Sequence, residues 1–247
     1  MTRLLCFVCL CLHTALVHAG CGGLAELSVY DLTERRELPV YTHSGRCYVA
    51  GKPGNEYQIV LRSRASEDLL AVVSVDGVNA ITGENASPAQ SGYVTEPRQS
   101  IEIRGWRKSL QRVAAFYFTD LGDTYASRTG RPHNVGVIGA AIFRRKPAPV
   151  PFADLQRGEQ SAKSEESAAR AAVPGAQGLG TGHGRSVASA AQYTAFERAT
   201  IGPDEVIAVY YDSRPNLMAR GVIPGPLPGH DLSPFPARFA PDPPGNG

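Results

Sequence analysis

The residues best suited to chemistry lie in a glycine-rich stretch, Gly180-Thr181-Gly182-His183-Gly184-Arg185. Glycines on both sides of His183 allow the backbone to approach a ligand closely, and Arg185 could bind a carboxylate or a phosphate. The stretch lacks the Lys-Ser or Lys-Thr pair that a nucleotide-binding P-loop requires. It therefore predicts either a ligand contact through His183 and Arg185 or a glycine-rich loop that packs against the fold.

A second candidate, Tyr211-Asp212-Ser213-Arg214, ends an apolar run. Together with His183, the Asp212 and Ser213 side chains contain the groups of an acyl-transfer triad. A small-molecule hydrolase would use His183, Asp212 and Arg214 as its catalytic residues. The chain contains no Gly-x-Ser-x-Gly elbow, however, and Asp-Ser-Arg-Pro also fits a turn that closes a strand. We therefore expect a protein without catalytic activity and keep the enzyme as the alternative.

The single tryptophan, Trp106, is followed by Arg107 and Lys108. If Trp106 is exposed, this group could bind sugars or aromatic ligands by stacking. If Trp106 is buried, the ring fills a core and the arginine stem reaches to water. Trp106 and Arg107 thus join His183 and Arg185 as candidate ligand contacts.

Metal and cofactor sites are not expected. Asp120 and Asp123 supply fewer oxygen donors than a calcium site needs. The histidines are too dispersed in the sequence for a zinc site; they include His43, His133 and His230.

The elements that would position these residues are predominantly strands. Apolar and polar residues alternate over 57–63, whereas 69–75 and 112–119 are almost wholly apolar, as in strands covered on both faces. Turn signals such as Asp76-Gly77 separate the runs, and no long amphipathic helix lies between them. The predicted fold is all-β, with an antiparallel sandwich or jelly-roll-like domain at 38–143.

The chain beyond residue 143 differs in composition. Residues 144–178 are rich in Pro, Ala, Ser, Glu and Gln, which predicts a flexible linker. Strands are expected again at 193–198 and 206–211, with a third at 217–223, in a small β appendage at 179–223 that folds back on the sandwich. The last segment, 224–247, is predicted to be a Pro-rich surface tail.

The first nineteen residues have the features of a signal peptide: Arg3, an apolar run at 4–17 and the small-residue site Val17-His18-Ala19. Residues 20–37 would form an N-terminal segment of an exported protein. Two hypotheses remain open for Cys21: a disulfide with Cys47, or a lipid anchor on Cys21 as the first residue of a lipoprotein. A true start near Leu38 would instead leave the protein in the cytoplasm.

The formal net charge of +2 gives no global field that would attract nucleic acid. The apolar leader is too short for a membrane span, and no later stretch approaches the required length. The expected partner is therefore another envelope protein or a small ligand.

Several segments carry a resemblance to a family of uncharacterised bacterial proteins. They are Val73-Ser74-Val75-Asp76-Gly77-Val78-Asn79, Gln90-Ser91-Gly92-Tyr93-Val94, Gly105-Trp106-Arg107-Lys108-Ser109, Arg128-Thr129-Gly130-Arg131-Pro132, Asn134-Val135-Gly136-Val137-Ile138-Gly139, the glycine-rich stretch 179–185 and Tyr211-Asp212-Ser213-Arg214. The resemblance covers most of 38–223 and implies neither an activity nor catalytic residues. The function predicted from the sequence is a binding or structural role at the cell envelope, with the loops 76–90 and 120–134 as the contact surface.

Overall fold

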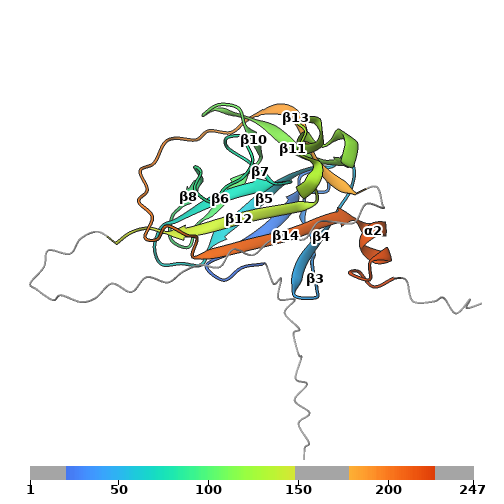
Figure 1. Ribbon diagram of the computed structural model, residues 1–247, viewed down its shortest axis with the longest axis horizontal. Helices are drawn as coiled ribbons and strands as arrows, with labels where there is room; N and C mark the ends of the chain where they lie inside the picture. Colours follow the sequence, from blue (N-terminus) through green and yellow to red (C-terminus); the bar gives the residue numbers. More distant parts are fainter. Residues whose placement is uncertain (1–20, 148–177, 226–247) are drawn as a thin grey trace, which may run out of the picture.

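The computed structural model of the protein describes residues 21–147 and 178–225 (Figure 1). The predicted signal peptide, residues 148–177 of the predicted linker and residues 226–247 of the predicted tail, which include His230, lie outside the described residues. The linker predicted from residue 144 begins later, because Arg144 ends a strand and Arg145 forms a bridge with Arg198. No helix within the described ranges has the length and apolar character needed to cross a bilayer.

Two seven-stranded sheets face each other, so the predicted all-β sandwich is confirmed. The pairing is antiparallel except between the strands at 205–213 and 46–51, which run parallel, so the second sheet is mixed. Sheet A has the order β10 (Gly105–Arg107), β11 (Arg112–Asp120), β5 (Glu56–Ser63), β1 (Ala25–Asp31) and β2 (Arg36–Glu37), with β13 (Leu179–Ala188) on β11 and β9 (Ser100–Ile103) on β5. Sheet B has the order β3 (Val40–His43), β4 (Arg46–Gly51), β14 (Glu205–Ser213), β12 (Val137–Arg144), β6 (Leu69–Val75) and β7 (Val78–Asn79), with β8 (Tyr93–Thr95) on β6. The short helices are η1 (Leu121–Asp123), α1 (Tyr125–Arg128), η2 (Pro132–Asn134) and α2 (Arg214–Ala219).

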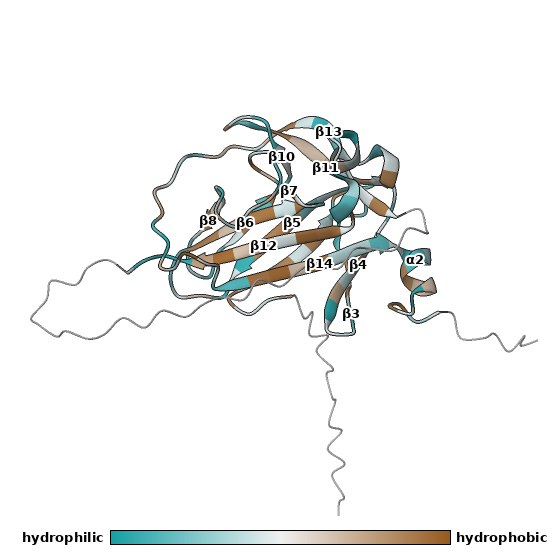
Figure 2. Cartoon of the chain, viewed as in Figure 1, coloured by the Kyte–Doolittle hydropathy of each residue, from teal (hydrophilic) through white to brown (hydrophobic). Residues whose placement is uncertain are grey.

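The alternation of apolar residues determines which side chains enter the core between the sheets. In β5, Tyr57, Ile59 and Leu61 point inward and are fully buried. The nearly continuous apolar run of β6 is buried on both faces: one set of side chains joins the main core, and Leu70 and Val72 belong to a cluster on the outer face of sheet B. Figure 2 shows apolar residues along the central strands of sheet B.

The outer face of sheet B has two covers. We call residues 189–201, which connect β13 to β14, the strap; its Phe196 packs on Phe143 and its neighbours. At the other end, Leu217 of α2 packs with Tyr48.

Two strands predicted from the sequence for these covering segments are absent. The strand expected at 193–198 is irregular chain apart from a bridge at Arg198, and the strand expected at 217–223 is helix α2 and the turn after it.

The flanking segments are built into the sandwich. In the expected appendage, β13 pairs along β11 in sheet A, and β14 lies between β12 and β4 in sheet B. The segment expected before the sandwich supplies β1, which pairs along the whole of β5. Because the strands of 179–223 lie inside both sheets, the appendage and the sandwich share one core.

Cys21 and Cys47 lie at disulfide-bonding distance, with 1.98 Å between their sulfur atoms. Cys21 forms a bridge with Leu27 of β1, and Cys47 lies in β4. The pair therefore connects the start of a sheet A strand to sheet B.

Candidate functional site

The glycine-rich stretch is strand β13 rather than a loop, and its glycines allow close packing. A Cβ on Gly180 would lie 2.2 Å from Cγ2 of Thr124, and one on Gly182 would lie 2.2 Å from the ring of Tyr117. Such distances leave no room for a side chain. This geometry favours packing over ligand binding as the reason for these glycines.

The other candidate ligand contacts have partners within the protein. His183 is exposed beside the ring of Tyr125, 5.4 Å away between centroids, and partial burial lowers its pKa. Arg185 forms a bidentate pair with Glu56, at 2.7 and 2.9 Å. Trp106 is only 3% exposed, and its Nε1 donates to the carbonyl of Gly182, so its ring belongs to the core.

The catalytic candidates are not assembled. The Asp212 carboxylate accepts hydrogen bonds from the backbone of Leu179 and Ser213 and from the amide of Asn216. Ser213 caps α2 by accepting from the Asn216 N–H. Asp212 also lies 3.5 Å from the Arg220 guanidinium. His183 is not among the partners of Asp212, and the ring beside it is that of Tyr125, so the two side chains do not form an acid–base pair.

A buried polar chain lies between the sheets and was not predicted from the sequence. Asp76, 1% exposed, accepts a hydrogen bond from the Tyr211 hydroxyl at 2.5 Å, and the Thr181 hydroxyl lies 2.6 Å from Tyr211 and 2.7 Å from Tyr57. Backbone N–H groups of Thr181 and Gly136 also donate to the carboxylate. Burial raises the pKa of Asp76 to about 6, against the effect of these hydrogen bonds.

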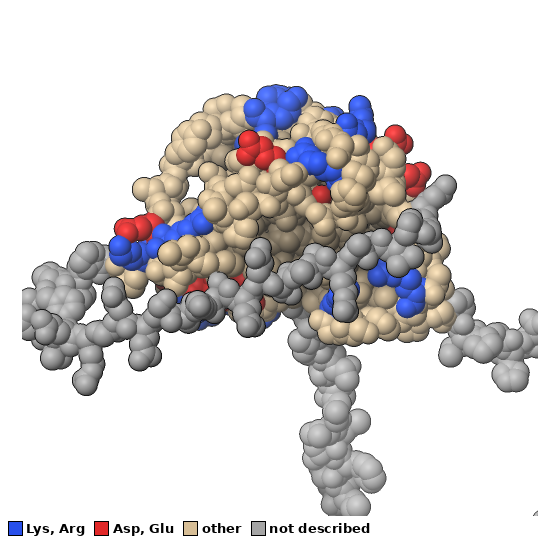
Figure 3. Space-filling model, in the orientation of Figure 1, with Lys and Arg blue, Asp and Glu red and all other residues tan. Residues whose placement is uncertain are grey.

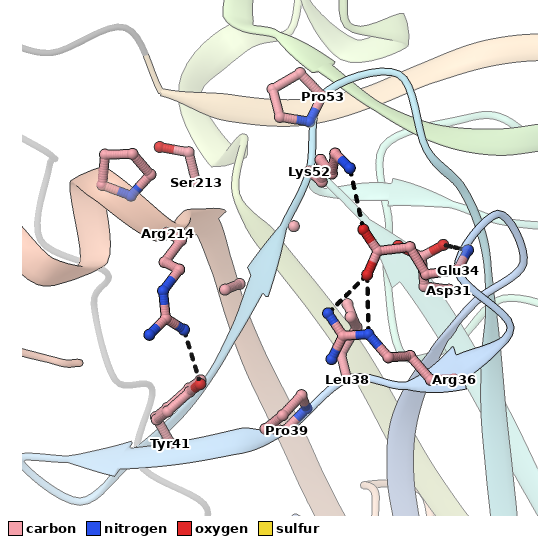
Figure 4. A pocket seen from close by; sticks show the side chains of 13 residues that line it. Asp31, Glu34, Arg36, Leu38, Pro39, Tyr41, Lys52, Pro53, Ser213 and Arg214 are labelled. Atoms are coloured by element: carbon pink, nitrogen blue, oxygen red, sulfur yellow. Dashed lines mark hydrogen bonds and ion pairs between the residues drawn. The ribbon is translucent and has the colours of Figure 1, made fainter. Parts of the chain in front are cut away.

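A pocket of about 390 Å³, which we call the anion pocket, opens where the β1–β2 turn of sheet A meets β3, β4 and α2 (Figure 4). Glu34, Arg36 and Lys52 form one wall, and Tyr41 and Arg214 form the other. Apolar lining comes from residues that include Leu38, Pro39, Pro53 and Pro215.

Cations outnumber accessible acids in the anion pocket. Glu34 bonds both Arg36 and Lys52, which lowers the pKa of its carboxyl group. Asp31 is buried, and its oxygens accept from two backbone N–H groups and from Asn55. The Arg214 guanidinium has a single described partner, the Tyr41 hydroxyl, at 3.4 Å. Three cations therefore face one accessible carboxylate.

A larger hollow of about 1240 Å³ lies beneath the strap, and we call it the strap groove. Its lining combines residues 89–94 and 96 beside β8, Arg107 and Leu110 near the β10–β11 turn, and most of the strap. Figure 3 shows the opening between the strap and the body of the protein. Of the predicted ligand contacts, Arg107 lines this groove, while its neighbour Trp106 faces the core.

The two loops predicted as a contact surface do meet. Arg131 donates to the carbonyl of Gly83, and a Cβ on Gly77 would contact Asn134. These contacts place loops 76–90 and 120–134 together at one end of the sandwich.

Within the described ranges, no group of three or more His, Cys, Asp or Glu side chains could hold a metal ion. No family model, curated protein or solved structure matches the chain. The resemblance to a family of uncharacterised bacterial proteins stays a prediction.

Proposed function

We propose that the protein is an exported, non-enzymatic binding protein that holds a small organic anion in the anion pocket. The observation that supports this proposal is the arrangement of Arg214, which has no carboxylate partner among the described residues and faces Arg36 and Lys52 across the pocket. A carboxylate on the ligand would give Arg214 the charge-assisted partner that it lacks.

The pocket would recognise a ligand that has both a charge and an apolar body. The Arg214 guanidinium can bind a carboxylate through two parallel hydrogen bonds, and Lys52 has donors beyond the one used by Glu34. The apolar part would rest on Leu38, Pro39 and Pro53. A volume of about 390 Å³ is in the range of small-molecule sites.

Titration calorimetry with benzoate tests the proposal. Benzoate should bind the wild-type protein, while benzyl alcohol, which has the same ring without the charge, should not. Arg214→Gln should weaken benzoate binding at least about tenfold, since a hydrogen bond to a charged group contributes about 1.5–3 kcal/mol. Arg62→Gln is the control, because Arg62 is exposed on β5 outside the pocket. The anion site is refuted if benzoate does not bind the wild type, or if the wild type and Arg214→Gln bind benzoate with equal affinity.

Export is the second part of the proposal, and the Cys21–Cys47 pair supports it because disulfides persist in oxidising compartments. Lipidation and disulfide formation require the same Cys21 sulfur, so the mass of the natively expressed protein distinguishes them. We expect an unmodified chain that begins near Gly20 in the extracytoplasmic fraction. A cytosolic product that starts near Leu38 would contradict export.

A further inference from the structure

We infer that the strap groove binds a neutral oligosaccharide chain. The groove and the anion pocket share no lining residue, so this second site is independent of the proposed anion site. Four features of the groove support the inference: a strap fixed at both ends, unpaired polar groups at its centre, charges of both signs along its lining, and an exposed ring.

The strap is fixed at both ends. At its start, Arg107 donates to the carbonyl of Ser189 at 2.6 Å, and the Ala191 N–H donates to the carbonyl of Leu110. Near its end, the Arg198 guanidinium lies over the Phe143 ring, 4.0 Å from the centroid, and donates to the carbonyls of Pro88 and Gln90. The groove is therefore held open by fixed contacts before any ligand binds, which reduces the entropy cost of binding.

The middle of the strap has polar groups available to a ligand. Gln192, Tyr193 and Thr194 make no hydrogen bond, by backbone or side chain, to any other residue in the described part of the chain. Amide and hydroxyl groups that both donate and accept match the hydroxyls of a sugar, which do the same.

The charged side chains around the groove are mostly engaged within the protein. Asp68 is paired with Arg145 and Glu197 with Lys146, while Arg107 and Arg198 donate to backbone carbonyls. In the view of Figure 3, the strap above the opening carries no charged atoms. The lining as a whole mixes both signs, with Asp68, Glu96 and Glu197 against Arg107 and Arg198. A surface without one dominant sign of charge favours a neutral ligand over an ionic polymer.

An exposed ring supplies the apolar component of recognition. Tyr93 also lines the groove, but it is half-buried against the core, with the Arg107 guanidinium 5.9 Å from its ring centroid. The accessible ring is that of Tyr193, which is 91% exposed on the strap. The flat apolar face of a sugar ring can stack on such a side chain. A volume of about 1240 Å³ exceeds the usual small-molecule range of about 300–1,000 Å³ and has room for several sugar units.

An extended peptide fits the groove less well. Peptides commonly bind by adding a strand to an exposed sheet edge. The strand beside the groove, β8, has only three residues and is followed shortly by Pro97, which has no N–H to donate. Recognition through side-chain amides, hydroxyls and rings is therefore the better match.

Calorimetry on the mature protein tests the inference with four neutral probes: maltohexaose, cellohexaose, laminarihexaose and chitohexaose. A ten-residue Ala/Ser peptide serves as the comparison for chain shape without sugar chemistry. We expect at least one hexasaccharide to bind, and the peptide not to bind. Tyr193→Ala should weaken binding about tenfold, and Tyr193→Trp should retain it because the larger ring still stacks.

Leu121→Ser is the matched control, because Leu121 is an exposed apolar residue outside the groove. Arg214→Gln should leave sugar binding unchanged, and Tyr193→Ala should leave benzoate binding unchanged. The sugar site and the anion site can therefore each be refuted without refuting the other. The inference is overturned if no hexasaccharide binds, if the peptide binds instead, or if Tyr193→Ala binds sugar as tightly as the wild type.

Discussion

At the scale of single residues, the protein's most unusual group is the buried Asp76 carboxylate. The Tyr211 hydroxyl donates its only proton to Asp76, so Thr181 must donate to Tyr211, and Tyr57 must donate to Thr181. The three hydroxyl protons thus all point toward the ionised carboxylate. Tyr57 and Thr181 belong to sheet A, Tyr211 belongs to sheet B, and Asp76 lies in the turn between β6 and β7 of sheet B. This series of hydrogen bonds, which we call the Asp76 chain, therefore joins the two layers.

Asp76 makes stability depend on pH. Burial raises the pKa of Asp76 from 3.8 to about 6, so the folded state holds this proton more tightly than the unfolded state. The resulting stabilisation is complete below the unfolded pKa and is lost as the pH rises through about 6. The free energy of unfolding of the wild type, relative to Asp76→Asn, should be about 2 kcal/mol greater at pH 4.5 than at pH 7.5. Urea titrations at both pH values measure this difference.

Partial burial lowers the pKa of His183, so this group makes the free energy of unfolding rise with pH, opposite to the effect of Asp76. Both the wild type and Asp76→Asn contain His183, so its contribution cancels in their comparison. Gly202→Ala is the control because it adds and removes no titratable group and no atom lies within 4 Å of its Cβ position. The pH dependence of its free energy of unfolding should match that of the wild type. Parallel curves for the wild type and Asp76→Asn would show that Asp76 does not titrate in this range.

At the scale of elements, β13 shows why a glycine-rich sequence can form a strand. Tyr117 of β11 occupies the space above Gly182, and the carbonyl of Gly182 accepts from Trp106. Gly182→Ala should destabilise the protein by about 1–3 kcal/mol, because its Cβ would overlap the Tyr117 ring. In urea denaturation, the control Gly202→Ala should stay within about 0.5 kcal/mol of the wild type, since no atom lies within 4 Å of its Cβ position. Equal stability of the two variants would argue against the packing role.

The elements that could be predicted from the sequence are those whose local pattern agrees with their packing. Strands β5, β6, β11 and β12 have the alternating or continuous apolar runs that burial between layers requires. Helix α2 was missed because Asp-Ser-Arg-Pro fits a turn as well as a helix start, and only the Ser213 cap and the Leu217 contact with Tyr48 distinguish them. In β1, Leu27 and Val29 alternate with polar residues, which is the pattern of a half-buried strand. This strand was not predicted because charged, turn-like residues follow it directly.

The candidate sites were harder to predict because they join distant segments. Arg36, Lys52 and Arg214 meet only through the pairing of β14 with β4 and the position of the β1–β2 turn. The strap groove likewise depends on residues near 90, 107 and 193 that the sheets bring together. Local spacing contains no information about such contacts. For Trp106, in contrast, the sequence predicts two alternatives, an exposed ring that binds a ligand or a buried ring in the core, because burial alone decides between them.

At the scale of the whole molecule, the Cys21–Cys47 pair and the Asp76 chain connect the two sheets by different means. A disulfide between these cysteines would close a loop of 26 residues that contains β1, β2 and β3, so it would limit the freedom of this whole segment in the unfolded chain. The chain-entropy estimate for a loop of this length is about 3 kcal/mol. Reduction should therefore weaken the fold without requiring any change to the folded core.

We expect the double variant Cys21→Ser, Cys47→Ser to unfold at a lower urea concentration than the oxidised protein, with a loss of about 3 kcal/mol. The wild type treated with a reducing agent should match the variant, and adding the agent to the variant should have no further effect. Thiol counting by mass spectrometry should find no free cysteine in protein recovered from an oxidising compartment. Two reactive thiols in the recovered wild type would contradict the cross-link. Because the Asp76 chain lies elsewhere between the sheets, the pH dependence that it gives to the free energy of unfolding should persist in the double variant.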